Sequence, residues 1–276
     1  ANTAAAPARL EVGHASLGWQ GWREGHRTPV EIRLSGVKLR GEDGAVQAEL
    51  PDAAISLSLA RMLRGEIAPH LLELQRPSLS LTRNAEGQVA VQLDTAPSTG
   101  AKPFEDLLAE LMRVPNDDSP MGTLARLRIQ GGRLLVPDAA LGTAWTLAEV
   151  AMDLRRLPEG GVTLQGRGQL RLGDQNVPVT IGGQMAGAPA ETTLRLSIAE
   201  LRPAALAAGV PALAPLAALD APSRLDLALR LDATGVAMAA EATLAFGAGH
   251  LDLGAGRRLA MAGGEVVAAF TPGALN

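Results

Sequence analysis

Residues Leu225–Leu231 read Leu-Asp-Leu-Ala-Leu-Arg-Leu, so a leucine occupies every second position. Residues Val30–Ser35 read Val-Glu-Ile-Arg-Leu-Ser and repeat this alternation near the other end of the chain. Successive side chains of a β-strand point to opposite faces of a sheet, so a period of two predicts strands with one apolar and one wet face. This pattern indicates the fold class, because a helix places residues three and four apart, not two apart, on one face.

The alternation recurs along the chain between turn signals such as Pro158–Gly161 and Gly173-Asp174. Its spacing predicts about a dozen strands in a mainly β fold, a curved and mostly antiparallel sheet with one or two short helices. Aliphatic residues at the alternate positions form the expected apolar face, and they are Val30, Ile32, Leu34, Ile55, Leu57, Leu72, Leu74, Leu79, Leu81, Val89, Val91, Leu127, Ile129, Val150, Met152, Leu154, Leu170, Leu172, Val179, Ile181, Leu194, Leu196, Ile198, Leu225, Leu227 and Leu229.

Helical periodicity is confined to short segments. Phe104–Met112 carries its apolar residues on one helical face, and Val114-Pro115 should end that helix. Shorter helical stretches are predicted just before Gly65 and from Arg202 to Gly209. The amphipathic helix could cap or gate an apolar surface, or it could pack on the sheet as ordinary core.

The Pro-, Gly- and Ser-rich stretch Thr95–Pro103 is the best candidate linker. We therefore expect an N-terminal β segment over 1–94, a linker with the amphipathic helix over 95–121, and a C-terminal β segment over 122–276. Two stretches, Leu72–Leu81 and Leu127–Val136, each read as a strand, a two-residue break and a second strand. This similarity predicts two hairpin units, with turns at the breaks Arg76-Pro77 and Gly131-Gly132.

Composition excludes several classes of protein. Hydrophobic residues make up 47% of the chain, which excludes intrinsic disorder, yet aromatic residues are only 2%. The net charge is −4 and the basic residues are dispersed, so no nucleic-acid-binding surface is expected. The absence of cysteine excludes disulfides, thiolate zinc sites and a cysteine nucleophile. No apolar stretch approaches the roughly 18 residues of a transmembrane helix.

No combination of residues indicates catalysis, a cofactor or a metal. The histidines His14, His26, His70 and His250 are scattered, and the acidic stretch Asn116–Ser119 lacks the ligand spacing of a calcium loop. Gly-Arg-Gly at 166–168 and Gly-Ala-Gly at 254–256 lack the third glycine of a dinucleotide-binding fingerprint and predict bulges or turns instead. Trp19 and Trp22 could lie at a membrane interface or plug one end of the sheet.

The chain resembles the AsmA-like family of bacterial envelope proteins, most closely its YhdP-type branch, with TamB proteins as more distant relatives. The segments that carry the resemblance are Ile55–Leu59, Leu63–Pro69, Leu72–Arg83 with Glu86-Gly87, Leu127–Leu134 with Pro137-Asp138, and Leu201–Leu206. Together they extend over roughly residues 28–270.

The resemblance implies an open, taco-like β-groove lined with aliphatic side chains that conducts phospholipids between the inner and outer membranes. It also implies a periplasmic location, with an inner-membrane anchor in the full-length protein that this chain lacks. We thus expect an excised periplasmic segment or a short family member, a non-enzymatic protein whose partners are phospholipids or other acyl-chain lipids and possibly membrane proteins of the envelope.

Two functions remain open on the sequence alone. Alternating aliphatic side chains suit acyl chains, because burial of apolar surface is non-directional and contributes roughly 25 cal/mol per Å². In the alternative, the apolar face is sealed as a closed core, and the protein is a structural or assembly scaffold for outer-membrane biogenesis that binds partners through its edge strands.

Overall fold

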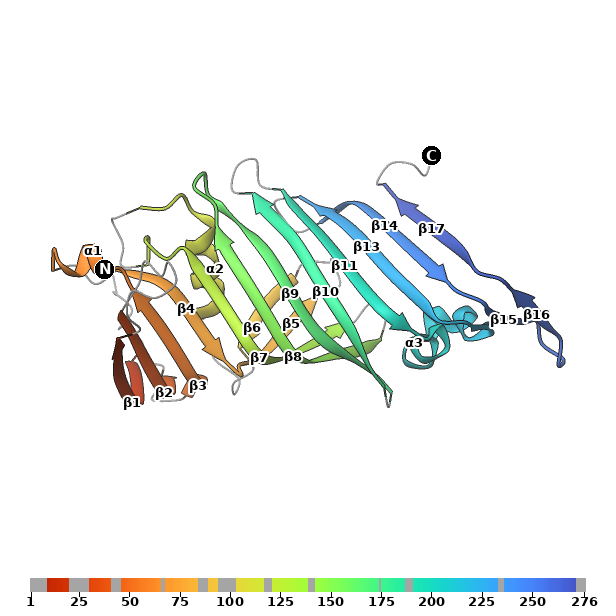
Figure 1. Ribbon diagram of the computed structural model, residues 1–276, viewed down its shortest axis with the longest axis horizontal. Coiled ribbons are helices and arrows are strands. Elements are labelled where there is room, and N and C mark those ends of the chain that lie inside the picture. Colours follow the sequence, from red (N-terminus) through yellow and green to blue (C-terminus); the bar gives the residue numbers. More distant parts are fainter. Residues whose placement is uncertain are drawn as a thin grey trace, which may run out of the picture.

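The computed structural model describes residues 9–19, 30–40, 46–65, 68–83, 89–93, 103–116, 121–138, 142–173, 175–186, 191–232 and 236–271. The fold class predicted from the sequence is confirmed. The chain is mainly β, with one large, curved, mostly antiparallel sheet that is not closed into a barrel, and a few short helices (Figure 1). Within these residues no helix is both long and apolar enough to cross a bilayer.

The described residues form more strands than the dozen expected. The strands are β1 (Arg9–Trp19), β2 (Val30–Arg40), β3 (Val46–Leu57), β4 (Pro69–Gln75), β5 (Ser78–Arg83), β6 (Val89–Leu93), β7 (Arg126–Asp138), β8 (Thr143–Arg156), β9 (Gly161–Leu172), β10 (Gln175–Ala186), β11 (Thr192–Leu201), β12 (Leu219–Asp220), β13 (Ser223–Leu231), β14 (Ala237–Phe246), β15 (Gly249–Asp252), β16 (Arg258–Met261) and β17 (Gly264–Phe270). The helices are α1 (Leu59–Met62), α2 (Pro103–Met112), α3 (Pro203–Gly209) and the 3₁₀ helix η2 (Pro211–Ala218).

The main sheet follows the order β1-β2-β3-β4-β7-β8-β9-β10-β11-β13-β14-β17. All neighbours along this path are antiparallel except β4 and β7, which are parallel. A short branch leaves the path at β7, where β5 pairs in parallel with the second half of β7 and β6 pairs with β5. A separate small sheet has the order β12-β15-β16.

The predicted hairpin over Leu72–Leu81 is wrong. Its two strands, β4 and β5, run in the same direction, and both pair with β7. At the break between them the backbone N–H of Arg76 donates to the carbonyl of Gln130, and the carbonyl of Pro77 accepts from Arg133. Because these backbone groups find their partners on β7, the break is a step along one neighbour strand and not a reversal of the chain.

The predicted turn at Gly131-Gly132 is also wrong, because β7 continues through it. The pairing with β8 shifts register on both sides of Gly132, and Gly131 adopts a positive φ of 63°, which a glycine tolerates without steric cost. The buried apolar residues of β7 before this bulge are Leu127 and Ile129, at odd positions, and the half-buried Leu134 lies after it at an even position. The bulge therefore changes the phase of the alternation so that apolar residues on both sides of it join one core.

The predicted helices are confirmed. The helix expected over Phe104–Met112 is α2, and the one expected up to Gly209 is α3, which begins at Pro203. The helical turn expected before Gly65 is α1, and Gly65 ends it with a positive φ of 80° and an N–H that donates to the carbonyl of Met62.

Two apolar cores lie on one face of the sheet. In the first, Leu111 of α2 and Leu79 of β5 pack with β7, β8 and β9 residues such as Leu127 and Leu154. In the second, Leu206 of α3 packs with residues of β9, β10 and β11, and η2 adds half-buried leucines. Figure 1 shows α2, β5 and β6 behind the strands β7–β10, on the side away from the viewer.

Arg156, at the end of β8, anchors α2 to the sheet. Its side chain is 1% exposed, and its guanidinium donates to five backbone carbonyls, those of Glu110, Arg113, Val114, Gly122 and Leu124, at 2.8–3.3 Å. Three of these carbonyls belong to the last turn of α2 or directly follow it, where a helix leaves its carbonyls without intrahelical partners. Desolvation lowers the pKa of Arg156, and the nearby Glu110 carboxylate partly opposes this shift.

We expect Arg156→Ala to lower the free energy of unfolding by about 3 kcal/mol, because it leaves buried carbonyls unsatisfied and opens a cavity under α2. Arg156→Lys should lose less, since an ammonium keeps the charge but offers fewer donors. Urea unfolding followed by circular dichroism measures both values. Arg155→Ala, at the exposed neighbouring position, is the control and should change stability by less than about 0.5 kcal/mol. Equal losses at positions 155 and 156 would contradict this role of Arg156.

Candidate functional site

The main sheet aligns apolar residues into a continuous row that crosses all twelve strands of its path. We name it the Leu194 row after its member on β11. Each member is the direct cross-strand partner of the next. From β1 to β17 the row is Leu17, Ile32, Ile55, Leu72, Leu127, Leu154, Leu164, Gly183, Leu194, Leu229, Ala240 and Phe270.

A second row, the Leu196 row, lies two residues along each strand and therefore on the same face. It also crosses all twelve strands, and all its members are apolar. From β1 to β17 it is Ala15, Leu34, Ala53, Leu74, Ile129, Met152, Gly166, Ile181, Leu196, Leu227, Ala242 and Ala268.

A third and shorter row, the Ile198 row, extends this face from β9 to β17. Its members are Gly168, Val179, Ile198, Leu225, Leu244 and Val266. Together the three rows form a band of one chemical character, because none of their members carries a charge or a hydrogen-bonding side chain. We call this surface the apolar band.

The opposite face of the same strands is polar. Between the Leu194 and Leu196 rows, cross-strand partners on that face include Arg33, Glu73, Arg128, Asp153 and Arg195. The alternation that the sequence predicts is therefore kept in register from strand to strand. It separates the two chemistries onto two faces of one sheet.

The apolar band is covered unequally by the rest of the chain. In the middle, Leu127 and Ile129 on β7 are fully buried beneath the first core. Toward β17 the cover is lost: leucines 227 and 229 on β13 are half-buried, Ala268 is exposed, and Phe270 is 51% exposed. At the opposite end, Leu17 on β1 is 74% exposed. The part of the band on β13, β14 and β17, which we call the open end, thus presents apolar side chains to the surroundings.

The structure brings most of the predicted apolar residues into this band. The Leu194 and Leu196 rows hold Ile32, Leu34, Ile55, Leu72, Leu74, Leu127, Ile129, Met152, Leu154, Ile181, Leu194, Leu196, Leu227 and Leu229, and the Ile198 row holds Val179, Ile198 and Leu225. Val30 and Leu57 are buried partners of each other. Leu170 and Leu172 belong to the second core, Leu79 to the first, and Val150 is buried beside the bulge of β8. The side chains of Leu81, Val89 and Val91 lie outside the described residues.

Several members of the band were not predicted. Leu164 precedes Gly-Arg-Gly, and that glycine-rich stretch hides the alternation of β9. On β14 the band is built from Ala240 and Ala242, and alanine is common on either face of a sheet. On β17 two consecutive valines interrupt the alternation, so neither Val266 nor Phe270 carries a signal. Cross-strand register, rather than any local pattern, identifies these residues.

Ion pairs stabilise the polar face. Both side-chain nitrogens of Arg126 that face Asp153 donate to its carboxylate, with an Nε–Oδ1 distance of 2.7 Å, and Arg155 approaches at 3.4 Å. The hydrogen bond from Arg126 is the main reason that the pKa of Asp153 is lowered. On β13 a hydrogen bond from Arg224 likewise lowers the pKa of Asp226, with help from the hydroxyl of Ser197.

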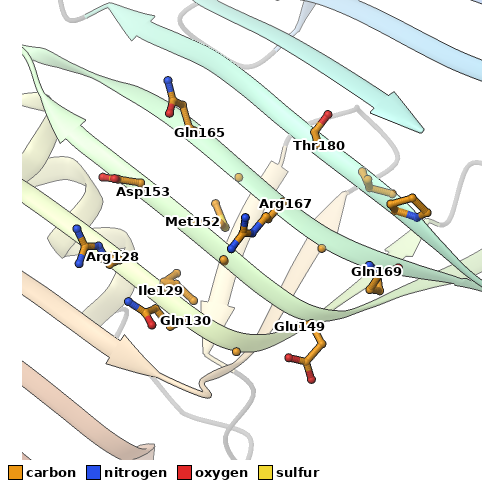
Figure 2. Close-up of a pocket in the computed structure, with 16 residues that line it drawn as sticks. Arg128, Ile129, Gln130, Glu149, Met152, Asp153, Gln165, Arg167, Gln169 and Thr180 are labelled. Carbon is orange, nitrogen blue, oxygen red and sulfur yellow. The ribbon is translucent and has the colours of Figure 1, made fainter. Parts of the chain in front are cut away.

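The polar face is hollowed where the bulges of β7 and β8 meet β9. A hollow of about 890 Å³ lies there, and Figure 2 shows Arg128, Asp153, Gln165 and Arg167 along its strands. Of these, Arg128 pairs with Glu73 at 3.2 Å, and Asp153 is held by Arg126. These two charged residues of the hollow are therefore ion-paired, and three members of the apolar band, Ile129, Met152 and Val179, line it as well.

The remaining sequence candidates do not converge on a site. His14, His70 and His250 lie on exposed positions of different strands, and His26 lies outside the described residues. Within the described part of the chain no group of three or more His, Cys, Asp or Glu could hold a metal ion. Gly166 and Gly168 lie inside β9, and Gly254–Gly256 form the turn between β15 and β16.

The tryptophans and the acidic stretch Asn116–Ser119 add no candidate site among the described residues. Trp145 is half-buried against the second core. The side chain of Trp19, all of Trp22 and the residues after Asn116 in the acidic stretch fall outside the described residues.

Comparison with known proteins finds no match: no family model, no curated protein and no solved structure is similar to this chain.

The ion pair of Asp153 predicts a pH-dependent stability. Asp153→Asn should destabilise the protein at neutral pH by roughly 1 kcal/mol, because the lost pair is only partly exposed. The lowered pKa in the folded state means that this contribution is full above the unfolded-state value of about 3.9 and is lost as the pH falls through the folded-state value. Urea titrations of both proteins between pH 2.5 and 7 should therefore converge at the acidic end.

The control is Asp52→Asn, which removes a more exposed ion pair with Arg76 and should cost less at every pH. A difference between wild type and Asp153→Asn that stays constant down to the lowest pH would show that the ion pair is not its source.

Proposed function

We propose that this chain is a non-enzymatic lipid-binding protein that holds acyl chains on the apolar band of its open sheet, and that it contributes to phospholipid transport and envelope homeostasis in bacteria. The observation that carries the proposal is the open end of the band. Exposed apolar side chains there continue, without a charged residue between them, into the same rows that form the first core.

The dimensions of the open end suit acyl chains. The apolar positions of β13 extend over the seven residues from Leu225 to Leu231, and the six steps between them span about 20 Å at about 3.3 Å per residue. One leaflet of a bilayer is about 15 Å of hydrocarbon, half of the roughly 30 Å core. A lipid tail can therefore lie along the strand over its whole length, and burial contributes about 0.8 kcal/mol per methylene group.

The chemistry of the band favours binding over catalysis. Its members are Ala, Gly, Leu, Ile, Val, Met and Phe, whose side chains neither transfer protons nor attack a substrate. At the open end, neighbouring positions along each row are all apolar, so no polar contact fixes a tail at one of them. This property suits movement of a tail across the open end, as far as the covered middle of the band. The resemblance of Leu72–Arg83 and its flanking segments to AsmA-like proteins supports a phospholipid as the ligand and the periplasm as the location.

A second candidate, the assembly scaffold, is favoured by the middle of the band. There Leu111, Leu127 and Leu154 form a dry core beneath α2, which leaves no room for a tail. In a scaffold the open end would be covered by a partner protein instead of a lipid. The two functions differ in whether the isolated chain retains phospholipid.

Native mass spectrometry of the purified chain, before and after mixing with phosphatidylethanolamine and phosphatidylglycerol, tests the proposal. We expect bound phospholipid on the wild type and less than about a tenth of it on Leu227→Asp/Leu229→Asp. An unpaired carboxylate beside an acyl chain costs several kcal/mol, and about 1.4 kcal/mol already corresponds to tenfold.

The matched control is Thr193→Asp/Ala228→Asp, which places the same charges on exposed positions of the polar face of β11 and β13. It should bind as the wild type does. Circular dichroism establishes that both variants are folded. A wild type that carries neither co-purified nor added phospholipid, or equal binding by both variants, contradicts lipid binding and leaves the scaffold.

A further inference from the structure

A hairpin at the end of the molecule carries an unusual combination of side chains. β15 and β16 are joined by residues 253–257, and Figure 1 shows this hairpin at the end of the molecule far from β1. All residues from Asp252 to Ala260 are exposed. Among them are two leucines, Leu253 and Leu259, which are 51% and 52% exposed.

Hydrogen bonds fix the conformation of the hairpin tip. The N–H of Leu253 donates to the carbonyl of Arg257 at 2.9 Å, and the N–H of Arg257 donates to the carbonyl of Gly254 at 3.1 Å. The carboxylate of Asp252 accepts from the N–H of Gly254 at 2.8 Å. Three consecutive residues, 254–256, have positive φ, and two of them are glycines, which adopt this conformation without steric cost. The tip therefore presents its side chains from a defined backbone.

Three leucines and one of the two arginines of the hairpin share one face. Leu259 is the cross-strand partner of Leu251, and Leu253 lies two residues beyond Leu251, so all three leucines share one face. Arg257 lies two residues before Leu259 and so on the face of the leucines, whereas Arg258, the first residue of β16, lies on the opposite face. In the described part of the chain neither guanidinium has an ion-pair or hydrogen-bond partner for its side chain. Asp252 pairs in register with Arg258, but its carboxylate is engaged by the backbone of Gly254.

We propose that this tip docks on the surface of an anionic phospholipid membrane. Exposed leucines beside cationic side chains match a membrane interface, where apolar groups enter the acyl boundary and guanidinium groups remain among the phosphates. The charge complementarity of Arg257 and Arg258 with anionic headgroups selects such a membrane over an apolar protein surface. The next strand, β17, exposes Val266 and Val267, one on each face of the sheet.

This inference goes beyond lipid binding by the apolar band, because it concerns a different surface. A membrane can be bound through the hairpin whether or not the band holds tails. The docking site would nevertheless place a membrane close to the open end of the band, since β16 leads directly into β17.

Co-sedimentation with vesicles tests the docking surface. We expect the protein to sediment with vesicles of phosphatidylethanolamine and phosphatidylglycerol, to bind pure phosphatidylcholine vesicles weakly, and to dissociate in 0.5 M NaCl. Arg257→Gln/Arg258→Gln should weaken binding about thirtyfold, or about fivefold for each guanidinium, because one basic residue near an anionic surface contributes about 1 kcal/mol. Leu253→Ser/Leu259→Ser should also weaken binding, and its residual binding should depend more strongly on salt.

The control Arg167→Gln/Arg195→Gln removes the same charge from exposed positions of the polar face, and it should change vesicle binding less than twofold. Native mass spectrometry separates this inference from the proposed function. The hairpin variants should retain bound phospholipid as the wild type does, and Leu227→Asp/Leu229→Asp should still sediment with vesicles.

Several results would overturn the inference. The first is that the protein fails to bind vesicles that contain phosphatidylglycerol, and the second is that it binds pure phosphatidylcholine vesicles equally well. The third is that Arg257→Gln/Arg258→Gln and the control Arg167→Gln/Arg195→Gln lose the same amount of binding. A second copy of the chain is the alternative occupant of the hairpin surface, and sedimentation velocity tests for it. A dimer that Leu253→Ser/Leu259→Ser dissociates would show that the hairpin is a self-association surface and not a membrane-docking one.

Discussion

Cross-strand pairing keeps the Leu194 and Leu196 rows aligned from β1 to β17, and the separation of the sheet into two faces depends on this register. A slip of one residue between any two strands would carry every apolar side chain beyond it to the polar face. The bulges in β7 and β8 show the same constraint at work within a strand. Each inserts backbone residues where the alternation of the sequence changes phase, at Gly131 and at Glu149, and so returns the apolar residues to the common face.

The two ends of the apolar band differ from its middle because the helices and short strands that cover the band lie over its central strands. α2 and β5 lie over β7–β9, and Arg156 secures the end of α2 with hydrogen bonds to five carbonyls. α3 and η2 cover the second core, nearer the ends of β9–β11. The same surface is therefore a conventional core at one place and a bare apolar sheet at another. This difference makes both lipid binding and scaffolding physically reasonable for one fold.

Local patterns in the sequence predicted the strands and helices well but predicted their connections poorly. The strand period of Leu225–Leu231 and the helical period of Phe104–Met112 are evident in the sequence, because each segment has one apolar face and one polar face. Arg76-Pro77 and Gly131-Gly132 look alike as breaks, yet one is a step between two strands and the other a bulge within one. The hydrogen-bond partners of the backbone distinguish them. At Arg76-Pro77 these partners are Gln130 and Arg133 of β7, more than 50 residues away in the chain, whereas Gly132 remains paired with Val150 of β8.

The parallel pairing of β4 with β7 also has a consequence for how the chain folds. Every antiparallel neighbour from β7 to β14 can form soon after its two strands leave the ribosome, apart from β11 and β13, which α3, η2 and β12 separate. The edge of β4 has to wait until β7 emerges, because Glu73 and its partner Arg128 are 55 residues apart. Contacts of such sequence separation slow folding, since the closure entropy of the intervening chain opposes them. The N-terminal strands therefore spend the longest time with an unpaired edge, and this junction is where a nascent chain would be most exposed to mispairing.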